Sequence, residues 1–157
     1  MRVRPATTAD LNDLLGLWQE LEDAQGRYRL FPPVADAAAR IETSFRDAIE
    51  AEDADVLLVL DGEDPVAMAL LHVEHPSRMS SERSVELSRV VVRADRRGAG
   101  IGEALIDAAA QWARDRGVRH LDAAVFVANE ASRRFWRRVG FEVWVERMVR
   151  PVDPPGD

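Results

Sequence analysis

The chain contains 157 residues, 46% of them apolar, which fits one domain with a substantial core. Its formal net charge of −7 argues against nucleic acid or a membrane surface as a partner, because both attract a basic protein surface. Cysteine is absent, which excludes disulfides, a thiolate nucleophile and a cysteine metal site.

The histidines and the N-terminal residues add further expectations. His72 and His75 are three residues apart in a predicted strand, where an odd separation places side chains on opposite faces, and His120 is isolated. We therefore predict no metal site. The first residues lead directly into polar sequence without an apolar signal region, and no apolar run reaches membrane-spanning length. We therefore expect a cytoplasmic protein.

The first third of the sequence predicts one short strand and two helices. The strand covers residues 3–4, and Thr7 and Asp10 have the spacing of a capping box for a helix that ends near Gly26. A second helix follows the two prolines at 32–33. Apolar residues recur at spacings of three and four in both helices. They are Leu11, Leu14, Leu15, Trp18 and Leu21 in the first helix and Val34, Ala38, Ile41, Phe45 and Ile49 in the second.

The middle of the chain predicts a β-hairpin and a third strand. The apolar runs Val56–Leu60 and Val66–Val73 flank a turn at residues 61–64, which is typical of two antiparallel strands. Pro76–Arg83 is polar and predicts a loop, and Ser84–Arg93 predicts the strand that follows it.

The most informative segment is the glycine-rich turn Arg97-Gly98-Ala99-Gly100-Ile101-Gly102, between the apolar run Val90-Val91-Val92 and an apolar-periodic stretch that ends at Trp112. A strand, a glycine turn and a helix start together present unpaired backbone N–H groups to an anion. Glycine is needed because the backbone must approach the ligand closely and can adopt positive φ. Arg96 and Arg97 add positive charge that can bind phosphate oxygens. The turn therefore predicts a phosphate site.

The spacing within the turn excludes two common phosphate-binding motifs. The dinucleotide fingerprint requires a third glycine where this chain has Glu103. The P-loop requires a lysine, and all 21 basic residues of this chain are arginines. The pattern Arg-x-x-Gly-x-Gly remains, and its ordinary alternative is a tight strand-to-helix connection without a ligand.

The last third of the sequence predicts a helix, a buried strand and a second helix. The helix that begins at Ile101 is expected to stop near Gly117. Leu121–Val127 is a continuous apolar run, as expected for a strand that is buried on both sides. Asn129 can cap the next helix, whose apolar residues are Phe135, Trp136 and Val139.

The C-terminal residues predict a closing strand and a tail. Phe141–Val149 is expected to complete the sheet. Residues 151–157 are rich in proline with nothing to bury, so we expect a disordered tail after a single domain at 1–150.

Three segments together resemble the GNAT superfamily of N-acetyltransferases. The turn at 97–102 resembles the family's acyl-coenzyme A pyrophosphate loop, and residues 129–141 are similar to its Asn…Phe/Leu-Tyr…Gly-Phe helix and following strand. Residues 3–6 with Asp10 and Leu11 also resemble the family's first strand and helix. The resemblance implies an α/β (α+β) fold with a mixed, mostly antiparallel sheet of six to seven strands and about four helices. It also implies that the sheet splays between Ser84–Arg93 and Leu121–Val127.

The resemblance implies acetyl-CoA as the co-substrate and assigns residues to it. The amides of Gly98, Ala99, Gly100, Ile101, Gly102 and Glu103, with Arg97, would bind the pyrophosphate at the positive end of the helix dipole. The backbone of Val90, Val91 and Val92 would pair with the pantetheine amides, as in the addition of one strand to a sheet edge. Asn129 and Trp136 would also lie at the cofactor. For the valine side chains and for Trp136, a place in the core is the alternative.

A catalytic base is required because an alkyl ammonium has a pKa near 10 and attacks a thioester only as the neutral amine. Glu86 is the candidate, since several family members have a glutamate at the matching position and its separation of six residues from Val92 predicts that both side chains face the same side. Ser88 and Glu74 are weaker substitutes. The alternative for Glu86 is a solvent-facing charge on a strand.

The chain departs from the family at the residue that protonates the leaving thiolate. Trp136 replaces the usual tyrosine, and an indole N–H does not release its proton usefully. The only tyrosine, Tyr28, is far away in the sequence. Either the thiolate, with a reference pKa near 8.5, leaves unassisted or takes a proton from water, or the protein binds the cofactor and catalyses poorly.

Two functions are therefore open. The first is an acetyl-CoA-dependent N-acetyltransferase that moves an acetyl group to a primary amine of a small molecule or peptide, by direct transfer in a ternary complex, because neither a cysteine nor a Gly-x-Ser-x-Gly motif is present. The second is a non-catalytic acyl-CoA-binding module. The resemblance also suggests a homodimer, with Trp144 as a candidate interface residue.

Overall fold

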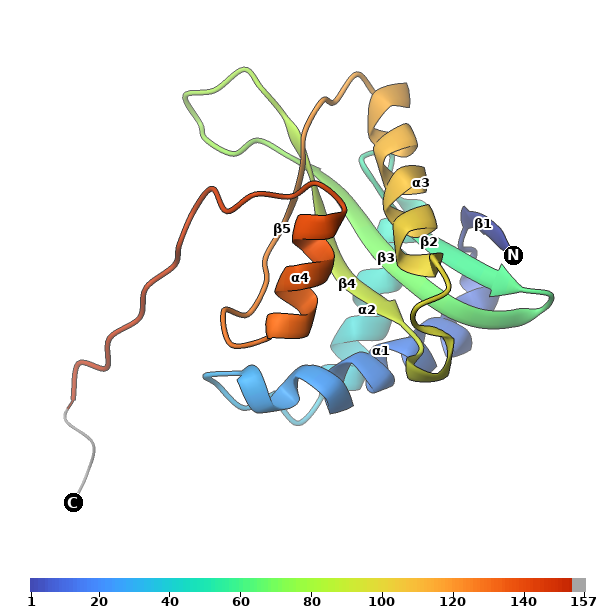
Figure 1. Cartoon of the computed structure of the whole chain (residues 1–157), viewed down its shortest axis with the longest axis horizontal. Helices are drawn as coiled ribbons and strands as arrows, with labels where there is room; N and C mark the ends of the chain where they lie inside the picture. Colours follow the sequence, from blue (N-terminus) through green and yellow to red (C-terminus); the bar gives the residue numbers. More distant parts are fainter. Residues whose placement is uncertain (154–157) are drawn as a thin grey trace.

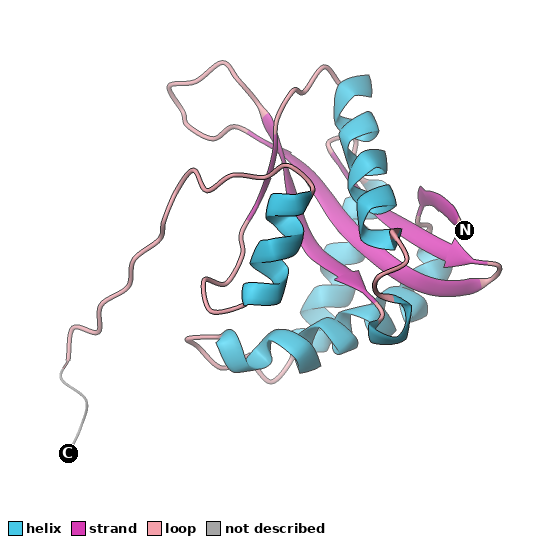
Figure 2. Ribbon diagram, viewed as in Figure 1, coloured by secondary structure: helices cyan, strands magenta, loops and turns pink. Residues whose placement is uncertain are grey.

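A computed structural model describes residues 1–153 and contains a five-stranded sheet covered by helices on both faces (Figures 1 and 2). The main helices and the strands follow the order β1 (Arg2–Pro5), α1 (Leu11–Gln25), α2 (Ala37–Glu50), β2 (Ala54–Asp61), β3 (Asp64–Glu74), β4 (Ser84–Val92), α3 (Ile101–Asp115), β5 (Leu121–Ala123) and α4 (Glu130–Arg138). Short 3₁₀ turns lie at Thr8–Asp10, Gly26–Tyr28 and Ala94–Arg96. The mixed, mostly antiparallel sheet and the four helices are as expected, but the prediction of six to seven strands is wrong.

The strands lie in the sheet in chain order, β1-β2-β3-β4-β5. The first four pair antiparallel, and the predicted hairpin is confirmed because Asp61 pairs with Asp64 at the end of the β2–β3 ladder. The last pair is parallel and short, since β5 pairs with β4 only from Val85 to Leu87. The predicted strand Leu121–Val127 therefore ends at Ala123, and residues 124–127 separate from the sheet.

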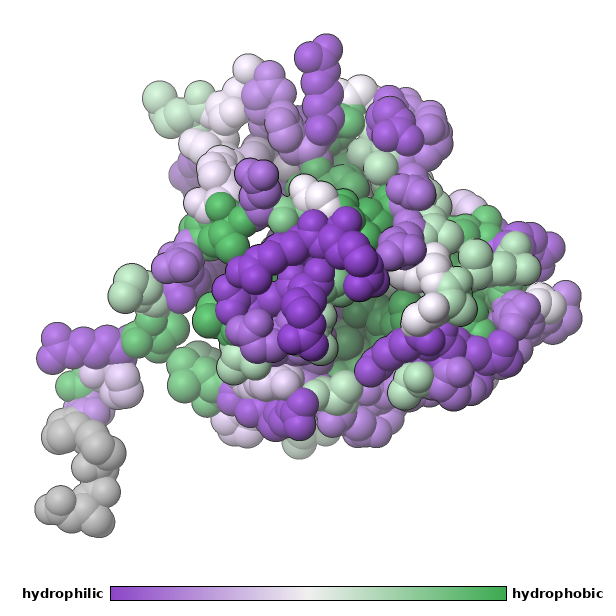
Figure 3. Space-filling model, viewed as in Figure 1, coloured by the Kyte–Doolittle hydropathy of each residue, from purple (hydrophilic) through white to green (hydrophobic). Residues whose placement is uncertain are grey.

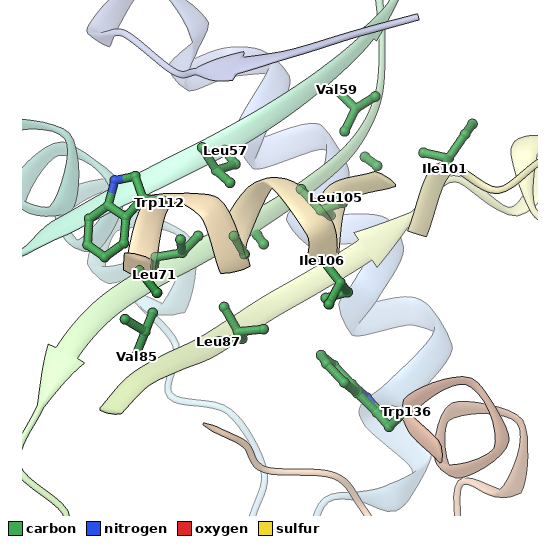
Figure 4. Packing of buried hydrophobic residues seen from close by; sticks show 14 of the residues in the cluster. Leu57, Val59, Leu71, Val85, Leu87, Ile101, Leu105, Ile106, Trp112 and Trp136 are labelled. Carbon is green, nitrogen blue, oxygen red and sulfur yellow. The ribbon is translucent and has the colours of Figure 1, made fainter. Parts of the chain in front are cut away.

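Two hydrophobic cores lie on the two faces of the sheet. On one face, α1 and α2 contribute Leu14, Trp18 and Phe45, which pack with Leu58, Met68 and other residues of β2 and β3. On the other face, α3 covers the sheet, and Leu105, Ile106 and Trp112 pack on Leu71, Val85 and Leu87 (Figure 4). Trp136 of α4 belongs to this second core, so α3 and α4 share one face. The amphipathic patterns of the sequence account for most of the helical residues in both cores, but Val34 lies before α2, and Val34 and Ala38 are exposed.

A β-bulge interrupts the third ladder and reverses the alternation of side chains along β4. Ser88 pairs with Leu70 and Val91 with Met68, so that Arg89 and Val90 together stand opposite Ala69. Before the bulge, Val85 and Leu87 face the α3 core. After it, Val90 and Val92 face that core, and Val91 faces the α1/α2 core.

The C-terminal segment differs from its prediction. No strand is present after Arg138 in the part of the chain that the structure describes, so the predicted strand Phe141–Val149 is absent. Phe141 packs against Trp136, and the chain after Phe141 runs away from the body of the molecule (Figure 1). Trp144 is 77% exposed, and its neighbours Val143 and Val145 are similarly open to solvent. The expected tail begins without regular structure at 151–153, and its last four residues lie outside the described residues. No helix among residues 1–153 is long and apolar enough to cross a membrane.

Candidate active site

The glycine turn has the backbone conformation that the sequence predicts. Gly98 and Gly100 adopt φ of +81° and +76°, a region that residues with a Cβ rarely occupy. Gly100 is also the N-cap of α3, and its carbonyl accepts a hydrogen bond from the amide of Ala104. The amides of residues 98–103 donate no hydrogen bond to any other described residue. The turn therefore presents a row of free donors at the positive end of a helix dipole, which is a fitting place for an anion.

Gly102 is required for a different reason from the one predicted. It lies inside the first turn of α3, and a Cβ built there would lie 2.8 Å from Cε2 of Phe135 on α4. A methyl group at this position would overlap the Phe135 ring. Gly102 therefore allows α3 and α4 to pack closely, and α4 carries Trp136 to the site.

Most of the positive charge near the turn is already paired. Arg96 bonds the carboxylates of Asp61 and Asp64 in the β2–β3 turn, and Arg138 on α4 donates to Glu103 Oε1 at 2.9 Å. Arg97 is exposed, and its Nε donates to the carbonyl of Val92 at 3.1 Å. The expectation that Arg96 offers free charge is therefore wrong, because that charge connects the turn to the hairpin. Arg97 retains open donors beside the glycines.

The sheet opens where β4 and β5 cease to pair. A narrow gap, which we call the splay gap, lies between Ser88–Val90 of β4 and residues 124–126, with Trp136 among its lining residues. On this side β4 has no ladder partner beyond Leu87. The predicted splay is confirmed, and it leaves the edge of β4 from Ser88 onward open to an added extended chain.

Trp136, which lines the splay gap, and Asn129, at the start of α4, both have clear structural roles. The Trp136 side chain is buried and contacts Phe135 and Phe141 edge to face, with ring centroids 5.3 and 4.8 Å away. The side chain of Asn129 accepts a hydrogen bond from the Ser132 amide at 3.1 Å, which confirms the predicted cap of α4. The outer surface of α4 is hydrophilic because of its arginines (Figure 3).

Tyr28 lies close to the site although it is distant in sequence. Its ring stacks on Phe126 with the centroids 6.1 Å apart, and Phe126 lines the splay gap. Its hydroxyl accepts a hydrogen bond from Arg27 at 2.7 Å. The sequence gives no signal for this contact, because it depends on how the turn after α1 packs against the chain after β5.

A larger cavity, which we call the α2 cavity, lies between α2 and the sheet. Its volume is about 450 Å³, within the range of small-molecule sites. Glu86 and His72 line it, and these two residues face each other across the β3–β4 ladder. Asp47 and Asp53 add acidic groups to the lining. Ser88 and Arg89 line both the α2 cavity and the splay gap, so the two spaces meet at these residues.

The bulge in β4 changes the interpretation of Glu86. Because the bulge shifts the alternation, Glu86 points into the α2 cavity while Val92 packs on the α3 core. The prediction that the two side chains face the same side is therefore wrong. Val91 is on the same face as Glu86, and Glu86 lies two residues before Ser88, where the two spaces meet.

The surroundings of Glu86 make its carboxyl a weaker acid than an exposed glutamate. Burial is the largest cause that raises the pKa of this carboxyl above its ordinary value, and the negative charges of Glu74 and Asp122 raise it further. His72 and Arg89 act in the opposite direction. A raised pKa brings a carboxylate closer to the basicity that proton abstraction near neutral pH requires.

Among residues 1–153, no group of three or more histidine, aspartate or glutamate side chains has the geometry to hold a metal ion.

The amino-acid sequence matches a known protein family. Residues 17–141 match the acetyltransferase (GNAT) family. The chain belongs to the GNAT acetyltransferase family. Among curated proteins, the chain is 35% identical over 78 residues to an uncharacterised N-acetyltransferase of Methanocaldococcus jannaschii. This match covers 50% of the chain and only 34% of the length of that relative.

Solved structures show the same fold as this GNAT protein at low sequence identity. A mutant protein from Bacillus halodurans superposes with a TM-score of 0.83 at 23% identity, covering 97% of this chain and 99% of that one. A Clostridium acetobutylicum protein, described as a predicted acetyltransferase with acetyl-CoA, gives 0.78 at 15% identity and covers 96% of both chains. An aminoglycoside 6′-N-acetyltransferase from Acinetobacter haemolyticus gives 0.75 at 20% identity, covering 98% of this chain and all of that one.

Proposed function

We propose that this GNAT protein transfers an acetyl group from acetyl-CoA to a primary amine of a small molecule or peptide. The observation that carries the proposal is the meeting of two spaces at Ser88 and Arg89: a splay gap beside the open edge of β4 and a cavity lined by Glu86. A thioester in the first space and an amine in the second would be adjacent. That adjacency is what direct transfer in a ternary complex requires.

The residues present fit the chemistry of the acyl carrier. The free amides of residues 98–103, with Arg97, suit a diphosphate, and a Cβ in the left-handed positions would strain the turn. The open edge of β4 at Val90–Val92 suits the amides of a pantetheine arm. The splay gap would then receive the thioester. Trp136 lines this gap and suits contact with the sulfur.

In the proposed reaction, Glu86 takes a proton from the acceptor ammonium, directly or through one water. The neutral nitrogen attacks the thioester carbonyl carbon, a C–N bond forms, the C–S bond breaks, and coenzyme A leaves as the thiolate. The nitrogen then loses its second proton to water or to the departing thiolate, which gives the neutral amide. Ser88, between the two spaces, is the closest alternative to Glu86 on the strand. No step requires an acid residue, since a thiolate with a reference pKa near 8.5 is a stable leaving group or takes a proton from water.

A second candidate function is favoured by one observation. Trp136 occupies the position of the usual acid and is packed as a core aromatic, which fits a protein that binds an acyl-CoA without turnover. Tyr28 does not settle the choice, since it contacts Phe126 and not the gap itself.

The two functions are separated by coenzyme A release, measured with acetyl-CoA and a broad panel of primary amines. Acetyl transfer predicts release above the hydrolysis background for at least one acceptor, and initial-rate lines that intersect. Tight acetyl-CoA binding with no release for any amine would support the binding module. Parallel initial-rate lines would contradict direct transfer.

The C-terminal segment supports a further part of the proposal, a homodimer. Val143, Trp144 and Val145 are large apolar residues that are mostly exposed, and a second copy would shield them. The cytoplasmic location stays a prediction from the sequence.

A further inference from the structure

Arg89 has an unusual backbone conformation at the centre of the site. Its φ is +50°, and it is the only residue other than glycine with positive φ among residues 1–153. It occupies the bulge of β4, where glycine would adopt this conformation without the strain that a Cβ causes at positive φ. A left-handed conformation costs an L-residue about 1–2 kcal/mol. An arginine in such a conformation points to a role for its side chain.

The Arg89 side chain is also unusual in its partners. It is partly buried, and its recorded hydrogen bond is a long one, 3.3 Å from Nη1 to Oγ of Ser88. No carboxylate among residues 1–153 lies within ion-pair distance of it. The other arginines of this part of the chain that lack an ion pair are all exposed. Arg89 therefore combines burial with an incompletely satisfied charge.

The charges around Arg89 do not neutralise it directly. Glu22 is the nearest acidic influence from α1, but its carboxylate is already bonded by Arg29. Glu86 also acts on Arg89 from the same strand, but no ion pair joins the two side chains. Burial lowers the pKa of Arg89, although a guanidinium remains charged in proteins. Five donors of fixed geometry thus lie where the splay gap and the α2 cavity meet.

We propose that Arg89 binds a carboxylate carried by the amine acceptor, so that the substrates are amino acids or other amines with a nearby carboxylate. This inference rests on the proposed acetyl transfer. The forked guanidinium matches a carboxylate and would hold it at the entrance to the splay gap. Glu86, three residues earlier on β4, would face the amine of the same molecule from within the α2 cavity. A zwitterionic acceptor would thereby be fixed at both ends.

A carboxylate could reach Arg89 from one other source, the acyl group of a dicarboxylic acyl-CoA. The carboxylates of the α2 cavity favour the acceptor as the source, because Glu86, Asp47 and Asp53 attract the ammonium end of a zwitterion. The lining has one further arginine, Arg40, and its guanidinium is paired with Asp36. An acyl carboxylate would gain nothing from the carboxylates of the cavity. This second source is tested by comparing the rates with succinyl-CoA, whose acyl group carries a carboxylate, and with butyryl-CoA, whose acyl group does not.

The first experiment measures coenzyme A release with pairs of acceptors that differ only in the carboxylate: glycine and glycinamide, β-alanine and β-alaninamide. Rates are compared per concentration of neutral amine, because the amide lowers the amine pKa. The wild type is expected to prefer the acids by about tenfold or more in kcat/KM, the range of a charge-assisted hydrogen-bonded pair. Arg89→Gln should abolish the preference, and Arg89→Lys should retain part of it. Arg2→Gln, an exposed arginine of β1, is the control and should change nothing.

Arg89→Gly provides a variant that folds readily, because glycine adopts positive φ without strain. It should lose the preference for acids while its melting temperature stays equal or rises. A preference that persists in Arg89→Gln and Arg89→Gly would overturn the proposal. Equal rates of the wild type with acids and amides would also overturn it. So would Arg89 variants that lose only the discrimination between succinyl-CoA and butyryl-CoA and keep the preference for acids.

The second experiment keeps the inference testable if acetyl transfer itself is not observed. Isothermal titration measures binding of the same acids and amides to the protein saturated with coenzyme A, which cannot react. Tighter binding of the acids that disappears in Arg89→Gln supports the carboxylate site even without turnover, and the failure then belongs to the proposed function. Equal affinity for acids and amides overturns the carboxylate site whether or not turnover occurs.

Discussion

Replacing Gly102 by alanine should weaken the contact between α3 and α4. The added Cβ would lie 2.8 Å from Cε2 and 3.1 Å from Cζ of Phe135. The ring would have to shift away from the new Cβ, and its neighbours are Trp136, with its ring centroid 5.3 Å away, and the Arg138 guanidinium, 5.6 Å from the Phe135 centroid. Such overpacking typically costs about 1–3 kcal/mol. The gain of up to about 1 kcal/mol from replacing a helical glycine offsets only part of it.

Gly16 provides a matched control for this prediction. It lies within α1, it is exposed, and a Cβ built there meets no atom within 4 Å. Gly16→Ala should therefore raise the free energy of unfolding by about 0.5–1 kcal/mol, through helix propensity alone. The difference between the two variants isolates the overlap with Phe135. It is expected to be about 1–3 kcal/mol in urea denaturation, or about 2–4 °C in melting temperature for each kcal/mol.

Equal stabilisation by Gly102→Ala and Gly16→Ala would show that the Phe135 ring accommodates the added methyl group without cost. A second check uses Phe135→Leu, which removes the ring edge that the new methyl group would meet. In that background, Gly102→Ala should lose most of its penalty, so the two substitutions should be non-additive. Additive effects would show that the penalty arises elsewhere.

Four further results are expected. Gly100→Glu should abolish acetyl-CoA binding in isothermal titration, while Gly117→Glu, which carries similar backbone strain at φ +69° beyond the end of α3, should leave the affinity unchanged. Glu86→Gln should lower kcat/KM by about 100-fold or more and remove the rise of kcat/KM with pH that accompanies ionisation of Glu86. Glu86→Gln should also raise the free energy of unfolding, by an amount that grows as pH rises above about 4. Burial raises the pKa of Glu86 in the folded state, so ionisation of this carboxyl at higher pH lowers the stability of the wild type, and glutamine has no carboxyl to ionise. Asp10→Asn should lower the free energy of unfolding at pH 7 by about 1–2 kcal/mol, since an arginine of β1 holds the pKa of Asp10 below its ordinary range. That difference should shrink in acid denaturation series below about pH 4, because a depressed pKa gives stability that is lost as pH falls. In sedimentation velocity, the wild type should be a dimer and Trp144→Ser should shift it towards monomer; a monomeric wild type would contradict the proposed interface.

The glycine turn could be predicted from the sequence because its requirements are local. A strand, a turn that needs positive φ and a helix start all lie within consecutive residues, and Gly98 and Gly100 have the conformation that the pattern indicates. The cap at Asn129 could be predicted for the same reason, because it also depends on neighbouring residues alone. Gly102 is different, because its role depends on a ring from another helix.

The bulge at Arg89 could not be predicted. Val85 to Ser88 alternate as an ordinary strand, and the three valines that follow are apolar in either register, so no residue marks the shift. The prediction that Glu86 and Val92 face the same side is therefore wrong. Phe141–Val149 has the alternation of a strand, but pattern alone does not supply a ladder partner, and the segment pairs with no described residue. Tyr28 reaches Phe126 through tertiary packing that no local signal reports.

The most direct test of the site is a titration of the isotope-labelled protein with coenzyme A, followed by amide NMR. The largest changes in chemical shift are expected at the free amides of residues 98–103, with smaller changes along the open edge of β4 from Ser88 to Val92. Pantetheine, which lacks the diphosphate, should perturb the β4 edge and leave the turn unchanged. Coenzyme A that perturbs other surfaces and leaves residues 98–103 unaffected would contradict the account.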